Sequence, residues 1–119
     1  IGTTRQLVRV IESVVPHLAG ERIHPATKTF QALRIAVNDE MGSLEDGLRA
    51  AFAALESGGT IAAISFHSIE DRTVKQYFAD LVRSAEAVLL TKKPVTPSAE
   101  EVAVNRRARS AKMRAIEKA

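Results

Sequence analysis

One stretch in the middle of the chain, residues 58–72, most constrains what this sequence can fold into. It opens with the pair Gly58–Gly59, continues with seven uncharged residues, and ends in Ser68-x-x-Asp71, a spacing that can cap a helix. Glycines can end a helix, and an apolar run without alternation is typical of a strand covered on both faces. The stretch therefore predicts a helix, a buried strand and a second helix, as in an α/β fold.

Three polar side chains, His67, Ser68 and Asp71, follow the predicted strand at its carboxyl end. Open α/β sheets bind ligands outside the carboxyl ends of their strands, so these three residues are the candidates for lining a substrate site. A structural role is the alternative, because Glu70 and Asp71 suit the positive end of a helix dipole and a histidine at a strand end is commonly a hydrogen-bonded structural residue. No nucleophile or second base with a recognisable spacing accompanies His67, so the catalytic residue stays unknown.

Apolar residues at helical or strand spacing predict the elements around this centre. The first helix is capped by Thr3 or Thr4 and ends at Pro16, and a loop over 17–24 follows it. The other expected elements are a helix over 25–38 with Pro25 in its first turn, an interruption at 39–43, a helix capped by Ser43 that closes at 57–59, a helix over 68–83, a strand over 85–91, a short helix capped by Ser98 and a strand over 110–117. In the last strand Lys112 and Arg114 alternate with apolar residues, which predicts one solvent-facing side.

Two faces run side by side along the predicted helix 25–38. The apolar face consists of Ala26, Phe30, Leu33 and Val37. The neighbouring polar face consists of Thr27, Gln31, Arg34 and Asn38. Most exposed helix faces are rich in Lys and Glu, whereas this one offers directional hydrogen-bonding groups. It indicates either an internal polar network that fixes the helix or a surface that recognises an RNA or nucleotide edge.

Positive charge is concentrated at the end of the sequence. The net charge is +3, but residues from Lys92 onward contain eight Lys or Arg against three Glu, so residues 1–91 carry −2. Such a segment suits phosphate contacts, because each neutralised phosphate releases counterions; a solvated basic surface is the alternative. The candidate RNA-binding residues in this segment are Lys92, Lys93, Arg106, Arg107 and Arg109.

The remaining composition excludes several classes of protein. The length of 119 residues suits one domain. The chain has no cysteine and only three scattered histidines, so we expect no disulfide and no metal site. No apolar run approaches the ~20 residues that span a bilayer and no signal peptide is recognisable, so a soluble protein is expected. The first residue is not methionine and is followed directly by a helical pattern, which indicates a piece of a longer protein.

Four ordered segments closely resemble one family. They are HPATKTFQALRIAVN at 24–38, ISFHSIEDR at 64–72, KKPVTPS at 92–98 and RARS at 107–110. Together they resemble the carboxyl-terminal part of the ribosomal RNA small-subunit methyltransferase H family, also called the MraW family. The resemblance covers essentially the whole chain. It implies an S-adenosylmethionine-dependent enzyme that methylates N4 of a decoding-centre cytosine in 16S ribosomal RNA, and therefore a cytoplasmic protein.

The resemblance also implies an architecture. Residues 1–38 would be the end of an inserted helical domain, and 39–119 the carboxyl-terminal part of a Rossmann-type methyltransferase domain. The final strand, 110–117, would insert antiparallel between 60–66 and 85–91 in a three-stranded mixed sheet with flanking helices. The cofactor loop would lie in a missing amino-terminal half, because Gly58–Gly59 precedes a strand, whereas a cofactor loop follows one.

Two consequences concern partners and activity. The outer edge of strand 60–66 would be bare without the missing half, so it would bind that half or a second copy of the chain. The isolated chain would bind no S-adenosylmethionine and would be inactive. A non-catalytic RNA-binding module that uses the basic tail, and a purely structural fragment, are the alternative functions.

Overall fold

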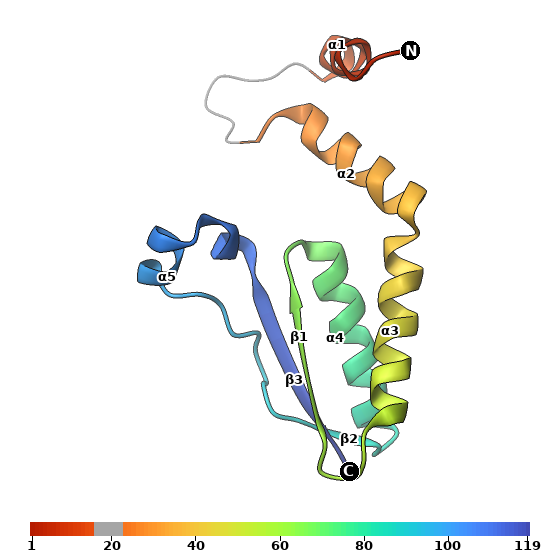
Figure 1. Ribbon diagram of the computed structural model, residues 1–119, viewed down its shortest axis with the longest axis vertical. Coiled ribbons are helices and arrows are strands. Elements are labelled where there is room, and N and C mark those ends of the chain that lie inside the picture. The colour runs from red at the N-terminus through yellow and green to blue at the C-terminus, as the bar shows by residue number, and fades with distance from the viewer. Residues whose placement is uncertain (16–22) are drawn as a thin grey trace. The chain divides into compact units, whose positions relative to one another are not determined.

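A computed structural model describes residues 1–15 and 23–119 of the chain. These residues form two compact units, Ile1–Glu40 and Met41–Ala119, each considered by itself below (Figure 1). The predicted helix end at Pro16 and most of the predicted loop at 17–24 lie outside the described residues. Within them, no helix combines the length and the apolar character that crossing a bilayer requires.

The first unit contains the helices α1 (Thr4–Val14) and α2 (Pro25–Asn38). Thr3, one of the two predicted caps, caps α1 and forms a capping box with Gln6. His24 caps α2, with Nδ1 accepting from the backbone N–H of Ala26 at 3.1 Å, while Nε2 lies 3.0 Å from Oε1 of Glu12 on α1. This histidine thus joins the start of α2 to the preceding helix.

The predicted apolar face of α2 is only partly covered. Ala26 is buried, but Leu33 is 45% exposed and Val37 is 82% exposed. The apolar pattern of this face is therefore not matched by burial along its full length within the described residues. Its amino-terminal end packs and its carboxyl-terminal end stays open to solvent.

A single residue separates α2 from the next helix. Asp39 ends α2 in the left-handed conformation, with φ of 47°, and α3 begins at once (Glu40–Ala54). Asparagine and aspartate tolerate this conformation better than other non-glycine residues do. The predicted interruption is found at Asp39 but does not extend to 43, and the predicted cap at Ser43 is wrong, because one left-handed residue is enough to end α2 before α3 begins at Glu40.

The end of α3 depends on the glycine pair. Gly58 has a φ of 80°, in the region that favours glycine. A Cβ on Gly59 would lie 2.9 Å from the carbonyl oxygen of Glu56 and from Cδ2 of Leu55. One glycine is thus required by its dihedral angle and the other by a close approach, which confirms the predicted stop.

The sheet of the second unit has the strand order β1–β3–β2, with bounds of Thr60–Ser65, Lys112–Lys118 and Ala87–Leu89. β3 runs antiparallel to both neighbours, which confirms the predicted insertion of the final strand. The expected mixed sheet is wrong, since every pairing among the described strands is antiparallel. β2 is also shorter than predicted, because Ala85 is left-handed and the N–H groups of Leu90 and Thr91 both approach the carbonyl oxygen of Ala115.

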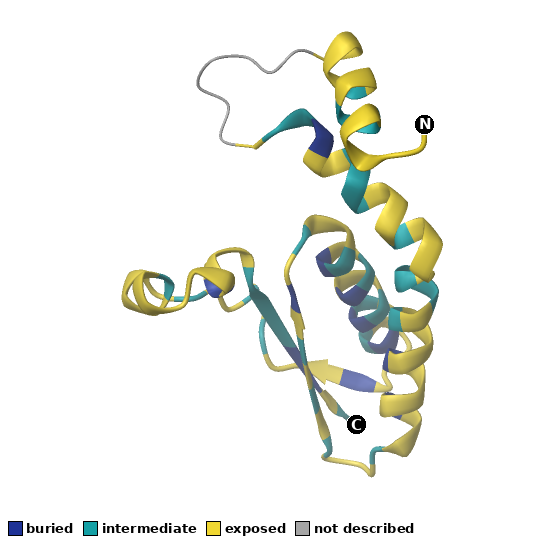
Figure 2. Cartoon of the chain, turned by 45° about the horizontal axis from the view of Figure 1, so that its top comes forward, coloured by how far each residue is buried: buried dark blue, intermediate teal, exposed yellow. Residues whose placement is uncertain are grey.

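Helices α3 and α4 (Ser68–Arg83) lie on one side of this sheet, as Figure 1 shows. Figure 2 shows buried residues concentrated along α4 where it faces the sheet. They belong to a core formed by Leu48, Phe52, Val74, Phe78, Leu81, Ala87 and Ile116. Burial of these side chains supplies the main driving force for packing α3 and α4 against the strands.

The opposite side of the sheet is open. Along β1, Ile61 and Ala63 pack against the core, whereas Ile64 is 60% exposed. Val88 on β2 and Val95, which pairs with Met113, are also at least half exposed. The prediction of a strand covered on both faces is therefore wrong within the described residues, although the uncharged sequence of β1 would suit a second covering layer.

Candidate functional site

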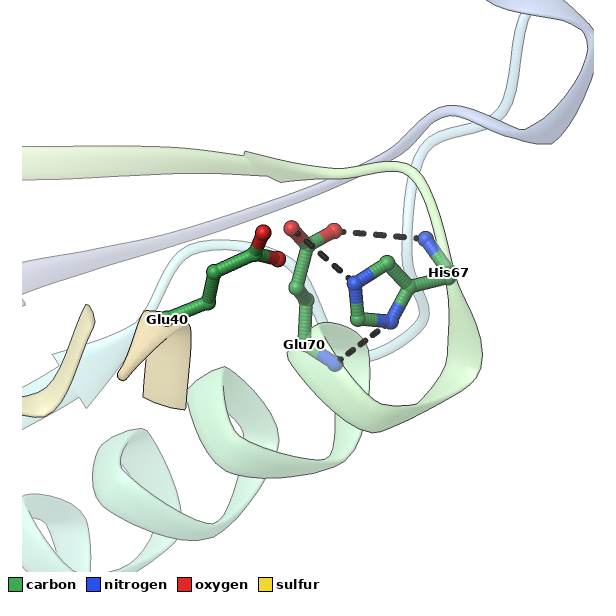
Figure 3. Close-up of side chains that lie close together, drawn as sticks. All are labelled: Glu40, His67 and Glu70. Atoms are coloured by element: carbon green, nitrogen blue, oxygen red, sulfur yellow. Dashed lines mark hydrogen bonds and ion pairs between the residues drawn. The ribbon is translucent and has the colours of Figure 1, made fainter. Parts of the chain in front are cut away.

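The carboxyl end of β1 passes into α4 through Phe66 and His67 (Figure 3). His67, and not the predicted Ser68, is the N-cap residue: its Nδ1 accepts from the backbone N–H of Glu70 at 3.3 Å. In return, Oε2 of Glu70 accepts from the backbone N–H groups of Phe66 at 2.8 Å and His67 at 3.3 Å. The capping box is thus one residue earlier than the sequence pattern indicated, with histidine as the cap.

These hydrogen bonds give the His67 ring a structural role as the cap of α4. Because Nδ1 accepts a hydrogen bond, the proton of the neutral ring lies on Nε2. Nε2 is buried and 3.2 Å from Oε1 of Glu70, but it is aligned for a hydrogen bond with no group of the described chain. The structural alternative for His67 and Glu70 is therefore the one the geometry supports. Ser68, the first residue of α4, is exposed at the same edge of the sheet.

Asp71 is held by two cationic side chains from β3. Nε of Arg114 donates to Oδ1 at 2.8 Å and Nη2 donates to Oδ2 at 3.2 Å, while Nζ of Lys112 lies 3.4 Å from Oδ2. The hydrogen bonds from Arg114 hold the pKa of the Asp71 carboxyl below its usual value, against the opposing effect of burial. This carboxylate fastens the first turn of α4 to the central strand.

The same contacts correct the prediction for the final strand. The side chains of Lys112 and Arg114 both lie on the helix-facing side of the sheet: that of Arg114 is only 13% exposed, whereas that of Lys112 contacts Asp71 and remains 41% exposed. Lys118, on the same side, donates from Nζ to the carbonyl oxygens of Phe52 at 3.2 Å and Leu55 at 2.7 Å, at the end of α3. A period of two shows that residues alternate but does not show which side is covered.

The arginine cluster lies near the same edge of the sheet. Residues Arg106–Ser110 form the 3₁₀ helix η1, which directly precedes β3, and Lys112 at the start of β3 pairs with Ser65 at the end of β1. Ala108 is buried and anchors η1, whereas the side chains of its arginines are exposed. The register therefore places η1 beside the β1–α4 junction.

The candidate lysines lie farther along the sheet. Lys92 and Lys93 follow Thr91, whose hydroxyl oxygen accepts from the N–H of Ala115, three residues into β3 from Lys112. Both lysines are exposed. Like the three arginines of η1, they have no carboxylate partner in the part of the chain that the structure describes. The short helix α5 (Ala99–Val104), capped by Ser98 as predicted, separates the two groups.

The polar face of α2 is partly an internal network. Nε and Nη2 of Arg34 donate to the two carboxylate oxygens of Glu40 at 2.7 and 3.0 Å, and Nδ2 of Asn38 lies 3.4 Å from Oε1 of Glu40. Thr27 is exposed and Gln31 is half-buried. For Arg34 and Asn38 the geometry supports the internal-network interpretation.

The described residues do not fit a glycine-rich cofactor loop. The junction of β1 with α4 contains Phe66 and His67 in place of glycines, and in the first turn of α4 the N–H of Glu70 already donates to Nδ1 of His67. Gly58 and Gly59 precede β1. A loop that cradles the cofactor needs glycines after a strand, at the opening of a helix.

Known proteins resemble the chain along its full length. It matches the family described as the MraW methylase family over residues 1–119. It is 52% identical to a ribosomal RNA small subunit methyltransferase H of Deinococcus deserti over 99% of this chain and 38% of that protein. It is 49% identical to the protein of the same name from Persephonella marina, over 96% of this chain and 39% of that protein. It is also 49% identical to the one from Acidobacterium capsulatum, over 99% of this chain and 40% of that protein.

These matches have two consequences. The chain spans about two-fifths of the length of these relatives. The four segments that carried the resemblance are part of a match over every residue of the chain, at identities near one half. The chain belongs to the MraW methylase family.

Proposed function

We propose that this chain is the carboxyl-terminal segment of an S-adenosylmethionine-dependent enzyme that methylates N4 of a decoding-centre cytosine in 16S ribosomal RNA, in the cytoplasm. The observation that carries the proposal is the family match over all 119 residues, together with relatives named ribosomal RNA small subunit methyltransferase H. Residues 1–38 are the end of an inserted helical domain, and 39–119 the last part of the Rossmann-type catalytic domain.

The substrate side is the edge where β1 ends. Ser68 and the arginines of η1 are exposed there, while His67 and Asp71 fix the first turn of α4 on which Ser68 lies. Methyl transfer to an amine depends mainly on positioning the two reactants. In this assignment, His67 and Asp71 are positioning residues, Ser68 lines the substrate side, and η1 contacts RNA phosphates.

Thr27, Gln31, Arg34 and Asn38 of the helical segment are assigned to the same RNA, with different roles. Arg34 and Asn38 hold the end of α2 through Glu40. Gln31 and Thr27 lie about one and two turns before Arg34 on α2 and offer an amide and a hydroxyl to a nucleotide edge.

Removing two arginines of η1 tests the RNA contact. Arg107→Ala combined with Arg109→Ala should weaken binding of single-stranded RNA and reduce the dependence of log K on log salt by roughly 0.7 for each phosphate that is no longer neutralised. The matched control removes Arg49 and Arg83, which are exposed but paired with Glu45 and Asp80. An equal salt dependence in both double variants would refute the assignment of η1 to RNA.

The cofactor and the rest of the enzyme are assigned to the part of the family's sequence that lies outside this chain. S-adenosylmethionine titrated calorimetrically into the chain alone should release no heat of binding. It should bind after the remaining three-fifths of a relative is added, and methylation of 16S RNA should appear only then. Binding to the chain alone would place the cofactor site within these residues and would overturn this part of the proposal.

The free edge of β1 is the proposed contact for that remaining part, or for a second copy when it is missing. Among the described strands β1 pairs on one side only, with β3, and no charged residue lies between Thr60 and Phe66. An uncharged, unpaired strand edge offers N–H and C=O groups to any further strand.

A non-catalytic RNA-binding module is the second candidate. Five exposed cations, Lys92, Lys93, Arg106, Arg107 and Arg109, have no carboxylate partner within the described residues, which favours it over a purely structural fragment. RNA binding that stays the same whether or not the remaining part and the cofactor are added, without methylation in either case, would support this candidate instead.

A further inference from the structure

A small pocket lies between α4 and the β2 side of the sheet, within the second unit. It is lined by Lys75, Phe78, Ala79, Leu89, Thr91, Lys92 and Arg114 and has a volume of about 100 Å³. Leu89 pairs with Ile116 on the helix-facing side of the sheet, so the pocket opens beside the core. It includes none of the residues at the β1–α4 junction or in η1.

The floor of the pocket is apolar. Phe78 is 1% exposed and closes the bottom, while Ala79 and Leu89 form accessible walls, with Leu89 41% exposed. Thr91 adds one polar group: its hydroxyl oxygen accepts from the N–H of Ala115 at 2.9 Å, which leaves the hydroxyl proton free to be donated. The interior thus suits a flat apolar ring that presents a hydrogen-bond acceptor.

The lining residues carry positive charge and no acidic group. Lys75 and Lys92 are exposed, and neither has a carboxylate partner among residues 1–15 and 23–119. Arg114 is bound to Asp71, but Lys112 shares the same carboxylate, so these three side chains together retain one positive charge. The charge of the site is therefore complementary to a phosphate.

The size of the pocket limits what can enter. A volume of about 100 Å³ holds several water molecules but is well below the ~300–1,000 Å³ of pockets that enclose a whole small molecule. A complete cofactor would not fit. A group that projects from a larger polymer would.

We propose that this pocket takes one nucleotide of single-stranded RNA, with the base against Ala79 and Leu89 and its phosphate beside Lys75 and Lys92. The inference rests on the proposed function, because it assigns a second contact on the same RNA, on the α4–β2 side of the domain. In this assignment Lys92 and Lys75, which lies in the middle of α4, bind the same phosphate. Lys93 does not line the pocket and serves only the general basic surface.

An amide-resolved NMR titration of the 119-residue chain tests this assignment. The probes are a short single-stranded oligoribonucleotide and, separately, inorganic phosphate and an acidic peptide of similar charge. The oligoribonucleotide should shift the amide signals of Ala79, Leu89 and Thr91. Inorganic phosphate should shift only the signals near the lysines, because it carries no ring for the apolar walls.

Two kinds of variant separate charge from shape. Lys75→Ala with Lys92→Ala should weaken binding at the pocket several-fold and remove the shifts of Ala79 and Leu89. Arg5→Ala with Lys28→Ala, which removes equal charge at exposed positions outside the pocket, should retain them. Ala79→Leu fills the cavity without changing charge and should abolish the same shifts. Well-dispersed spectra of each free variant exclude misfolding as the cause.

The outcomes distinguish the pocket from the general RNA contact. Shifts confined to η1 and Lys93 would overturn the pocket proposal and leave the proposed RNA contact intact. No shifts anywhere with the oligoribonucleotide would overturn both for this chain. Equal or larger pocket shifts with the acidic peptide would overturn the RNA assignment of the pocket in favour of a protein ligand.

Discussion

The carboxylate of Asp71 receives hydrogen bonds from side chains 41 and 43 residues later in the chain. Together with His67 it fixes the start of α4, at the point where β1 ends. Both side chains were candidates for direct contact with substrate, and both are engaged by other groups of the protein. At the scale of single residues, exposed neighbours such as Ser68 are therefore better placed to meet a ligand, while Asp71 and His67 hold the surface on which they lie.

Replacing Asp71 should reduce stability far more than replacing an exposed acid on the same helix. Asp71→Ala leaves the Arg114 guanidinium buried without its partner, which should lower the free energy of unfolding by about 3 kcal/mol. Asp80→Ala breaks an ion pair whose side chains are 51% and 74% exposed, and should lower it by less than about 1 kcal/mol. Urea denaturation of the two variants makes the comparison; equal effects would show that the Asp71 contacts contribute no more than a surface pair.

Stability should also depend on pH through Asp71. The pKa of Asp71 is lower in the folded protein than in the unfolded chain. Its stabilisation of the fold is therefore complete when the pH is above the pKa of the unfolded chain, and it is lost as the pH falls through the pKa of the folded protein. The difference in unfolding free energy between wild type and Asp71→Asn should therefore be largest near neutral pH and shrink below about pH 4. A difference that does not change with pH would contradict the lowered pKa.

At the scale of elements, the sequence predicts the helices and the strand order well, and the side-chain partners poorly. The glycine stop of α3, the caps Thr3 and Ser98 and the insertion of β3 are all found. Local signals were enough for the caps and the stop, because dihedral preference and capping act within one turn. The strand order came from the family resemblance and not from periodicity.

The failures have two causes, one local and one distant in sequence. The cap of α4 moved from Ser68 to His67 because His67-x-x-Glu70 offers a reciprocal pair of hydrogen bonds. The orientation of Arg114 depends on Asp71, which is distant in sequence. Whether a charged strand face is wet or neutralised depends on such a distant partner, and no local pattern contains that information.

Two glycines, one inside α3 and one just beyond its end, should respond oppositely to alanine. Gly58→Ala places a Cβ on a residue with φ of 80° and should lower the unfolding free energy by about 1–2 kcal/mol. Gly47→Ala introduces no contact within 4 Å inside α3 and should stabilise the protein by about 0.5–1 kcal/mol. Thermal or urea unfolding measures the sign of the change in unfolding free energy for each variant. A stabilising Gly58→Ala would show that the turn does not need a residue in the left-handed conformation.

At the scale of the whole molecule, the second unit has one covered and one uncovered side. The core lies between the helices and the sheet, whereas Ile64, Val88 and Val95 on the other side are exposed and β1 lacks an outer neighbour among the described strands. Exposed apolar surface next to an unpaired strand favours association. We expect the state of assembly of the isolated chain to depend on this side of β1.

A charge on the edge should suppress that association. Ala62 is an exposed residue in the middle of β1, and Ala62→Lys places a lysine on the open strand edge. Sedimentation should show a monomer for Ala62→Lys and concentration-dependent association for wild type. The control Ala50→Lys, which adds the same charge at an exposed position of α3, should associate like wild type. A monomeric wild type at every concentration would refute association through this edge.

The central position of β3 also determines when the sheet can form during synthesis. β1 and β2 are not neighbours, and within residues 1–15 and 23–119 each pairs only with β3, the last of the three strands to be synthesised. A nascent chain that has reached Ala111 therefore has two strands and no ladder between them, with Asp71 still lacking both cations. The sheet therefore cannot form before β3 is available, and until then β1 and β2 are apolar segments without a strand partner in the described chain, open to contact with other chains.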